Sequence, residues 1–214
     1  MHSRHILFDL DGTLVDSAPG ILQSFRVVLD GLGLDPAVPL DRGLIGPPLM
    51  DIVDRLLPAA TTQAKQQVAE AFKNDYDLHG VLASVRFTGI DECLSKLHQD
   101  GASLWLATNK RQAPTRRLAD AFGWGRLFNA TYSLDSFTPA KRSKAELLQD
   151  IIERHNIDRG RAVYVGDRKE DEDAANACNL RFVMVAWGYD TGVPTLAPLA
   201  TTPGALHNLI RQLG

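Results

Sequence analysis

One stretch near its start organises this 214-residue chain: His5-Ile6-Leu7-Phe8-Asp9-Leu10-Asp11-Gly12-Thr13-Leu14. Its short apolar run predicts a buried strand, and two carboxylates spaced i, i+2 follow, with a glycine directly behind them. Alternate residues of an extended chain point to the same side, but a turn at Gly12 would swing Asp11 away from Asp9. We therefore expect the two carboxylates to do different jobs at one site. Because nearby anions repel, a metal or a cationic side chain should complete that site.

The same short pattern, Asp-x-Asp-Gly, also occurs in ordinary turns and in calcium-binding loops. An EF-hand loop that began at Asp9 would need a glycine at position 14 and a bidentate glutamate at position 20. The chain has Leu14 and Gly20 at these positions. The pattern therefore excludes an EF-hand and leaves a catalytic turn and a purely structural turn open.

The composition is that of a soluble globular protein, with 44% apolar and 23% charged residues. The net charge of -3 comes from interspersed charges of both signs, which argues against a nucleic-acid partner. No apolar segment approaches bilayer-spanning length and no signal peptide is recognisable, so we expect a cytoplasmic protein without a membrane partner. Cys93 and Cys178 lie far apart in helix-like contexts, which favours reduced structural thiols over a disulfide or a metal site.

The segment from Asp16 to about Leu82 carries helical patterns and no strand pattern. Apolar residues at helical spacing predict one helix up to Leu32, with glycines and prolines after it. A second helix is predicted from Pro47-Pro48 to Leu57, and a third from Thr61 onward. Residues 16–82 are therefore predicted to form a helical domain inserted after the first strand.

From Val85 onward, predicted strands and helices alternate. Strands are predicted at 103–107, 130–133, 162–165 and 181–186, and helices at 89–99, 114–122, 144–155, 171–179 and 202–213. Continuous apolar strands that alternate with helices predict a parallel sheet covered on both faces. The predicted fold class is thus α/β: a three-layer α/β/α Rossmann-like core of residues 1–15 and 83–214, with the all-helical domain inserted.

Polar residues follow several of the predicted strands, and ligands of such sheets bind at the carboxyl ends of the strands. These residues are Asp9 and Asp11, then Thr108-Asn109-Lys110, then Lys141 and Lys144, and finally Gly166-Asp167 through Asp171. Carboxylates from two strand ends, with no histidine or cysteine among them, suit magnesium better than zinc. A hydroxyl and an ammonium beside such a site predict an anionic substrate with several oxygens, of which phosphate is the obvious candidate.

These motifs resemble those of the haloacid dehalogenase (HAD) superfamily, in the branch of phosphoglycolate-phosphatase-like hydrolases with a helical C1-type cap. The matching segments are Phe8-Asp9-Leu10-Asp11-Gly12-Thr13-Leu14, Ala107-Thr108-Asn109, a lysine, and Gly166-Asp167 with Asp171. The resemblance spans nearly the whole chain, and all four motifs have the family's order and spacing. It implies a magnesium-dependent phosphatase that acts on a small phosphorylated metabolite, as a monomer or a homodimer.

The resemblance also implies a role for each carboxylate. Asp9 would attack phosphorus and form an aspartyl-phosphate. Asp11 would act first as general acid and then as general base. Mg²⁺ would be held by Asp9, the backbone carbonyl of Asp11 and Asp167, with Asp171 as a ligand through water or as an orienting group.

The phosphoryl oxygens would be bound by Thr108 and a lysine, in a pocket to which Gly12 and Asn109 also contribute. Relatives often place a proline after the third-motif lysine, whereas this chain offers Lys141 and Lys144 without one. We favour Lys144 because it directly precedes a helix, and Lys141 remains the alternative. Residues 168–170 are expected to be loop residues on a solvated face, with contact between one of them and substrate as the alternative.

The inserted helical domain would be a cap that closes over the site and selects the leaving group. The stretch Arg42-Gly43-Leu44-Ile45-Gly46-Pro47-Pro48-Leu49 resembles the cap loop that approaches the site in relatives. Arg42 is therefore a candidate for contact with substrate, and the alternative is an exposed cap charge. No residue pattern identifies the leaving group.

Three other functions are compatible with parts of the pattern. A phosphomutase of the same fold would use both aspartates and return the phosphoryl group to a sugar phosphate. A phosphonate-cleaving relative needs a cap lysine, and Lys65 and Lys73 have no motif around them. A phospho-aspartate signalling module would carry its acceptor at a later strand than its acidic pair, whereas here the acidic pair comes first and no isolated aspartate ends the second strand.

Overall fold

A computed structural model describes residues 4–189 and 195–213. Its main feature is a six-stranded sheet of order β5-β4-β1-β6-β7-β8, in which all neighbouring strands are parallel. The strands are β1 (His5–Phe8), β4 (Ser103–Thr108), β5 (Phe128–Ser133), β6 (Ala162–Gly166), β7 (Arg181–Val185) and β8 (Leu199–Ala200). The predicted parallel sheet is confirmed, and β8 is an edge strand that the sequence did not reveal.

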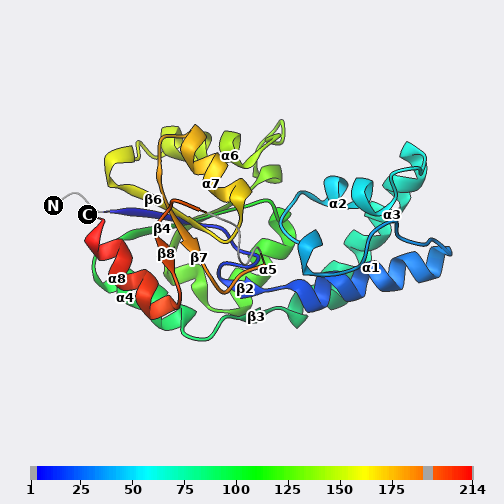
Figure 1. Cartoon of the computed structure of the whole chain (residues 1–214), viewed down its shortest axis with the longest axis horizontal. Helices are drawn as coiled ribbons and strands as arrows, with labels where there is room; N and C mark the ends of the chain where they lie inside the picture. The colour runs from blue at the N-terminus through cyan, green and yellow to red at the C-terminus, as the bar shows by residue number, and fades with distance from the viewer. Residues whose placement is uncertain (1–3, 190–194, 214) are drawn as a thin grey trace.

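Helices cover both faces of this sheet, because successive strand residues point to opposite sides. Ile6 and Phe8 of β1 join one apolar cluster, and Leu7 between them joins the other. The first cluster includes residues of α4 (Ile90–Gln99), α5 (Gln112–Ala121) and α8 (Pro203–Gln212), and the second those of α6 (Lys144–Arg154) and α7 (Lys169–Ala177). Figure 1 shows α6 and α7 on one side of the sheet and α4 and α8 on the other. The predicted three-layer α/β/α core is confirmed.

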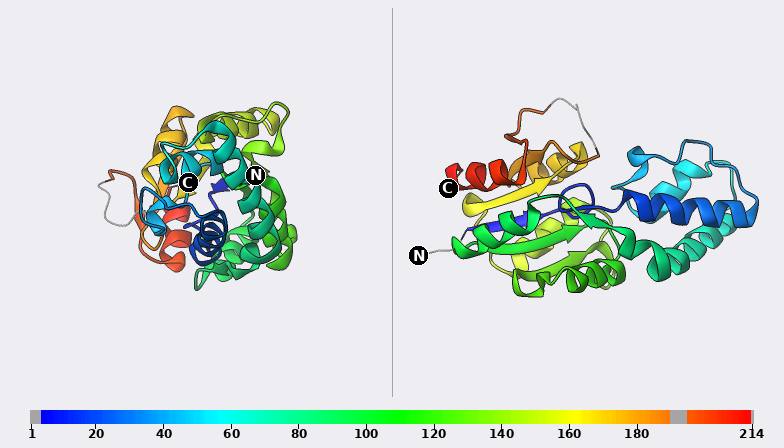
Figure 2. Two further views of the ribbon diagram at one scale, coloured as in Figure 1. Left: turned by 90° about the vertical axis from the view of Figure 1, so that its right-hand side faces the viewer. Right: turned by 90° about the horizontal axis from the view of Figure 1, so that it is seen from below.

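A group of helices, here called the helical lobe, lies beyond one end of the sheet, far from both termini (Figures 1 and 2). It contains α1 (Ala18–Leu32), α2 (Leu49–Leu56) and α3 (Thr62–Asp75), followed by a π-helical turn (Tyr76–Gly80) and a 3₁₀ turn (Val81–Ala83). Stacked aromatic rings hold it together: the ring centres of Phe25 and Phe72 are 4.1 Å apart, and those of Phe72 and Tyr76 are 5.3 Å apart. Residues 17–84, all of which are described, contain no strand, in agreement with the predicted helices.

A two-stranded antiparallel ribbon joins the lobe to the sheet domain. It consists of β2 (Val15–Asp16) and β3 (Val85–Arg86), paired Val15 with Arg86 and Asp16 with Val85. Strands of two residues are too short to show a period-2 pattern, so the sequence did not predict them. The ribbon places the outgoing and returning chains side by side at the root of the lobe.

Smaller differences from the predicted elements have local causes. Helix α5 begins at Gln112 and not at Pro114, because proline is tolerated in the first turn of a helix. Helix α7 begins at Lys169 and not at Asp171, since the Asp171 carboxylate accepts the Arg168 N–H and caps that helix. Further 3₁₀ turns lie at Arg42–Leu44, Trp124–Arg126, Leu134–Ser136 and Arg159–Arg161.

Two predictions from composition can be compared with the structure. Cys93 and Cys178 are both free and buried, as expected of structural thiols. Within residues 4–189 and 195–213, every helix is too short or too polar to cross a bilayer.

Candidate active site

The site lies where the carboxyl ends of three neighbouring strands meet. Strand β1 lies between β4 and β6, with Phe8 in register with Leu106 on one side and Val165 on the other. Asp9 directly follows β1, and its N–H donates to the Val165 carbonyl at 2.9 Å. Asp9 therefore lies between the ends of β4 and β6. In parallel sheets, a crevice forms where the connections from neighbouring strands run to opposite faces of the sheet.

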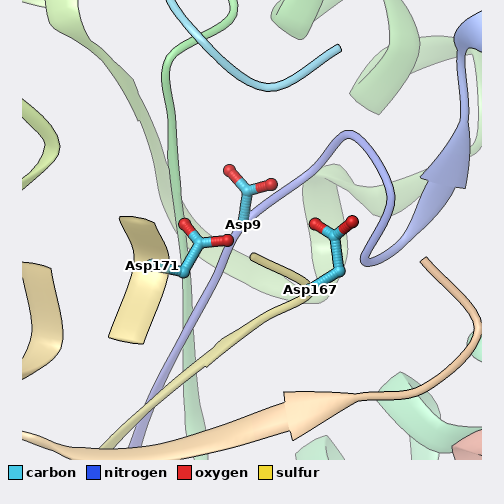
Figure 3. A group of neighbouring side chains, drawn as sticks. All are labelled: Asp9, Asp167 and Asp171. Carbon is cyan, nitrogen blue, oxygen red and sulfur yellow. The ribbon is translucent and has the colours of Figure 1, made fainter. Parts of the chain in front are cut away.

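Three carboxylates gather at this point: Asp9, Asp167 and Asp171, each with an oxygen within 4.8 Å of the others. Figure 3 shows them turned toward one another. Asp167 directly follows β6 and Asp171 belongs to the first turn of α7, and all three are buried. An all-oxygen donor set of this kind fits a hard divalent cation such as Mg²⁺.

The electrostatics of the cluster also favour a bound cation. Burial raises the pKa of Asp9 to about 7, against the lowering effect of Lys144. Burial, together with the charges of Asp171 and Asp9, raises the pKa of Asp167 well above its usual range. For Lys144, burial alone would lower the pKa, but Asp171 and Asp9 raise it overall and keep the ammonium charged. When all three carboxyl groups are ionised, a single ammonium leaves them with excess negative charge. A divalent cation would offset this charge in place of the protons that the raised pKa values retain.

Asp167 is held between two glycines. Gly12 has φ +89°, and a Cβ there would lie 2.3 Å from Asp167 Oδ2; a Cβ on Gly188 would lie 2.2 Å from Asp167 Cβ. The Tyr189 N–H donates to Asp167 Oδ2 at 2.7 Å. Gly12 was also predicted to contribute to phosphate binding. Its N–H donates to the Val15 carbonyl at 2.8 Å within the turn.

The structure separates the two candidate lysines. Lys144 Nζ lies 2.5 Å from Asp9 Oδ1 and 3.0 Å from Asp171 Oδ1. Lys141 Nζ instead pairs with Asp150 at 2.6 Å and lies 4.8 Å from the centre of the Phe137 ring. Lys144 therefore belongs to the carboxylate cluster, and Lys141 lies outside it.

Asp11 lies apart from this cluster and has its own partners. Its Oδ1 accepts from Ser17 Oγ at 2.5 Å and from Lys110 Nζ at 3.0 Å. Lys110 is buried, and its Nζ lies 4.7 Å from the centre of the Tyr76 ring. Lys110 follows the second of the strands predicted from the sequence, but no role was predicted for it. Its position two residues after Thr108, at a strand end, is the signal that could have found it.

Side chains beyond β4 and β6 also bind the lobe. Asn109 Nδ2 donates to the Gly46 carbonyl at 2.9 Å, and Arg168 Nη1 donates to the Ile45 carbonyl at 2.5 Å. The expectation that residues 168–170 form a solvated loop is correct only in part: Lys169 and Glu170 are exposed but begin α7, and Arg168 is half-buried against the lobe. Thr108 is buried at the end of β4, where its hydroxyl accepts the Lys110 N–H at 3.2 Å.

Arg42 lies at the root of the lobe. Its Nη2 pairs with Asp16 Oδ2 at 2.7 Å, and its guanidinium carbon lies 5.9 Å from the centre of the Tyr189 ring. These contacts place Arg42 beside the ribbon strand β2 and give it no contact with the three clustered carboxylates.

Two adjoining cavities open at the site. The larger, of about 460 Å³, is lined by the clustered residues Asp9, Lys144 and Asp171 and by the α2 side of the lobe. The smaller, of about 60 Å³, lies between Asp11 with Lys110 and apolar lobe side chains that include Ile21, Ile45 and Phe72. Both are lined by Gly46, Pro47 and Asn109. The pair of cavities offers space for a charged group beside Asp9 and for a small substituent beside Asp11.

Comparisons with known proteins agree with this arrangement. A crystal structure of a predicted phosphatase from Clostridium acetobutylicum superposes with a TM-score of 0.88 and 25% identity, over 99% of this chain and 100% of that one. A phosphoglycolate phosphatase of Cupriavidus necator is 33% identical over 190 residues, covering 86% of this chain and 81% of that protein.

The tyrosine-protein kinase PtkA of Mycobacterium tuberculosis is 32% identical over 185 residues, which cover 86% of this chain. The match spans only 62% of the length of that kinase. The family model described as haloacid dehalogenase-like hydrolase matches residues 6–185. With its motifs at three strand ends and its family match over most of its length, the chain belongs to the haloacid dehalogenase-like hydrolases.

Proposed function

We propose that this protein is a magnesium-dependent phosphatase that hydrolyses a small phosphate monoester through an aspartyl-phosphate on Asp9. One observation carries the proposal: the buried Asp9 carboxylate lies 2.5 Å from the Lys144 ammonium and beside two further carboxylates. A carboxylate in this position is suited to attack a phosphoryl group. The Lys144 ammonium and a bound Mg²⁺ would offset the negative charge of that group. The relatives named as phosphatases support the same reaction class.

In the first step, an oxygen of Asp9 attacks phosphorus, so that a new P–O bond forms as the ester P–O bond breaks. Lys144 and the Thr108 hydroxyl bind the phosphoryl oxygens and offset charge as it redistributes. Because Lys144 also contacts Asp171, its ammonium is held between the nucleophile and its neighbour. The ammonium is thus held beside Asp9 before substrate binds.

Asp11 is the proposed proton carrier. Its carboxylic acid gives a proton to the leaving alkoxide, and the resulting carboxylate then takes a proton from the water that attacks the aspartyl-phosphate. Release of phosphate regenerates Asp9 and the protonated Asp11. The contacts of Asp11 with Ser17 and Lys110 keep it separate from the nucleophile, so the two carboxylates can perform different tasks.

Asp9, Asp167, the backbone carbonyl of Asp11 and, directly or through water, Asp171 are the proposed holders of Mg²⁺. In support, three buried carboxylates lie close together and supply the oxygen ligands that this ion prefers. When bound, the ion would offset negative charge on the phosphoryl oxygens and help to orient them.

The lobe is the proposed cap, formed by residues 16–82 on a catalytic core of residues 1–15 and 83–214. Its apolar side chains line the small cavity beside Asp11, where the leaving group would lie. The small volume of this cavity, about 60 Å³, favours a small phosphorylated metabolite. Closure of the lobe would exclude water other than the attacking molecule.

The direct test is a screen of phosphate monoesters and a generic aryl phosphate, with Mg²⁺ and with a chelator, beside the Asp9→Asn protein. We expect phosphate release that depends on Mg²⁺ and is lost in Asp9→Asn. If the wild type released phosphate from none of these esters, the proposal would be wrong. Transfer of the phosphoryl group to a sugar phosphate, without net release, would instead identify a phosphomutase.

A further inference from the structure

Tyr189 contacts both the carboxylate cluster and the first helix of the lobe. We propose that Tyr189 is a positioning residue, whose hydroxyl fixes the start of α1 and, through Ser17, the carboxylate of Asp11. The inference rests on the proposed function, in which Asp11 carries the proton. It concerns a residue that none of the four sequence motifs contains.

The backbone of Tyr189 contacts the carboxylate cluster. Its N–H donates to Asp167 Oδ2 at 2.7 Å, directly after Gly188, which packs against the same carboxylate. Two residues earlier, Trp187 Nε1 donates to the Thr13 carbonyl at 3.0 Å. The segment that carries Tyr189 is therefore fixed to both the β1 turn and the end of β6.

The hydroxyl of Tyr189 lies at the N-terminus of α1. It accepts the N–H groups of Ser17 at 2.8 Å and Ala18 at 3.1 Å, and it donates to Asp16 Oδ1 at 3.1 Å. The first N–H groups of a helix have no partner within the helix. A side chain more than 170 positions away in sequence thus supplies an acceptor that a capping residue usually provides.

The N-cap residue itself is used differently. Ser17 makes no side-chain capping bond, and its hydroxyl donates to Asp11 Oδ1 at 2.5 Å. Ser17 and Ala18 are buried, so water cannot readily replace the Tyr189 hydroxyl as their acceptor. Loss of that hydroxyl would leave the buried Ser17 N–H unpaired, whereas the Ala18 N–H would keep its other acceptor, Asp16 Oδ1 at 3.2 Å. The Ser17 backbone would then shift, and with it the hydrogen bond to Asp11.

The Tyr189→Phe protein tests this role, because it keeps the ring and the N–H that binds Asp167 while it removes the hydroxyl. General-acid assistance matters most for a basic leaving group, so an alkyl phosphate needs Asp11 more than p-nitrophenyl phosphate does. We expect kcat/KM to fall about tenfold for the alkyl ester and much less for the aryl ester. The Mg²⁺ concentration for half-maximal activity should stay unchanged. Equal losses for both esters would indicate a merely structural role and overturn the proposal.

A double-mutant cycle then tests the route through Ser17. Ser17→Ala removes the hydrogen bond to Asp11 directly, so adding Tyr189→Phe to it should cause no further loss for the alkyl ester. Multiplication of the two losses would contradict the route. A wild type inactive on every ester would instead refute the proposed function.

A crystal structure of the Tyr189→Phe protein tests the positioning role independently of activity. We expect the hydrogen bond between Ser17 and Asp11 to be broken or lengthened. An unchanged contact between these two side chains would overturn the proposal, whatever the activity.

Discussion

The strand ends and the helical lobe meet at two cavities and contribute different side chains to their walls. The strand ends contribute buried charges in two ion-paired groups: Lys144 with Asp9 and Asp171, and Lys110 with Asp11. The lobe contributes apolar side chains such as Ile45 and Phe72 to the small cavity, and the charged Asp51, Asp54 and Arg55 to the larger one. It is held by hydrogen bonds to its backbone carbonyls. The proposed catalytic groups thus come from the sheet, and the apolar groups proposed to select the leaving group come from the lobe.

This difference implies different tolerances to substitution. A buried charge that loses its partner costs far more than a resized apolar contact, because it remains desolvated without compensation. Changes at the strand ends should therefore abolish turnover or folding. Changes in the lobe should instead redistribute activity among esters.

The largest effect is expected at the clustered lysine. Lys144→Ala leaves Asp9 and Asp171 without their shared ammonium, and we expect kcat/KM to fall by about 10³-fold. Lys141→Ala is the matched control, since Lys141 pairs with Asp150 outside the site, and it should retain activity within about twofold. Steady-state kinetics of both proteins decide between the two lysines. A larger loss in Lys141→Ala would reverse the assignment.

The next effect concerns the turn that separates the two carboxylates. Gly12→Ala introduces a methyl group 2.3 Å from Asp167 Oδ2 at φ +89° and should lower the free energy of unfolding by about 3 kcal/mol. Gly31→Ala is the control: it lies in α1, its added methyl group would meet no atom within 4 Å, and it should raise this free energy by about 0.5 kcal/mol. Urea unfolding measures both changes. Equal stability of the two variants would contradict the close approach at Gly12.

The charge of the cluster predicts how stability depends on pH. The pKa of Asp9 rises from 3.8 to about 7 on folding, so the folded protein binds more protons and the metal-free form loses stability as pH rises between these values. The raised pKa of Asp167 acts in the same direction. Mg²⁺ at about 100 times its Kd at pH 8 should raise the free energy of unfolding by about 2.7 kcal/mol at that pH. The same concentration should raise it less at pH 5.5, where protons compete with Mg²⁺ for the carboxylates. Thermal unfolding at both pH values checks this, and an equal Mg²⁺ effect at each would contradict it.

The smallest effect is expected in the lobe. Leu49 lines the small cavity, so Leu49→Ala should change the ratio of kcat/KM between a short and a bulky ester by about tenfold. Leu78→Ala is the control, because Leu78 is 68% exposed and does not line the cavity. Activity on a panel of esters measures the ratio. An unaltered panel in Leu49→Ala would argue against selection by this cavity.

Much of the fold and part of the site could be predicted because both follow from local patterns. Continuous apolar runs mark the strands, and parallel strands bring their carboxyl ends to one edge, so Asp9, Asp167 and Lys144 were expected together and lie together. The rule needs only the order of the elements and the residue that follows each strand.

The remaining features depend on approaches between distant segments. Lys110 meets Asp11 across 99 positions, and Tyr189 meets Ser17 across 172, without any pattern that links them in the sequence. Arg168 looked solvated because nothing local indicates that the Ile45 carbonyl lies beside it. The strands β2, β3 and β8 have two residues each and are formed by pairing with their neighbours, not by local preference.

In the proposed mechanism, Asp9 carries the phosphoryl group during turnover. Rapid quenching of the wild type with substrate and Mg²⁺, followed by borohydride reduction and peptide mass mapping, reads that group directly, because reduction converts an aspartyl-phosphate to homoserine. We expect homoserine at position 9, with Asp11, Asp167 and Asp171 unmodified, and no homoserine in the Asp9→Asn protein. Phosphate release with position 9 unmodified, or homoserine at another aspartate, would contradict it.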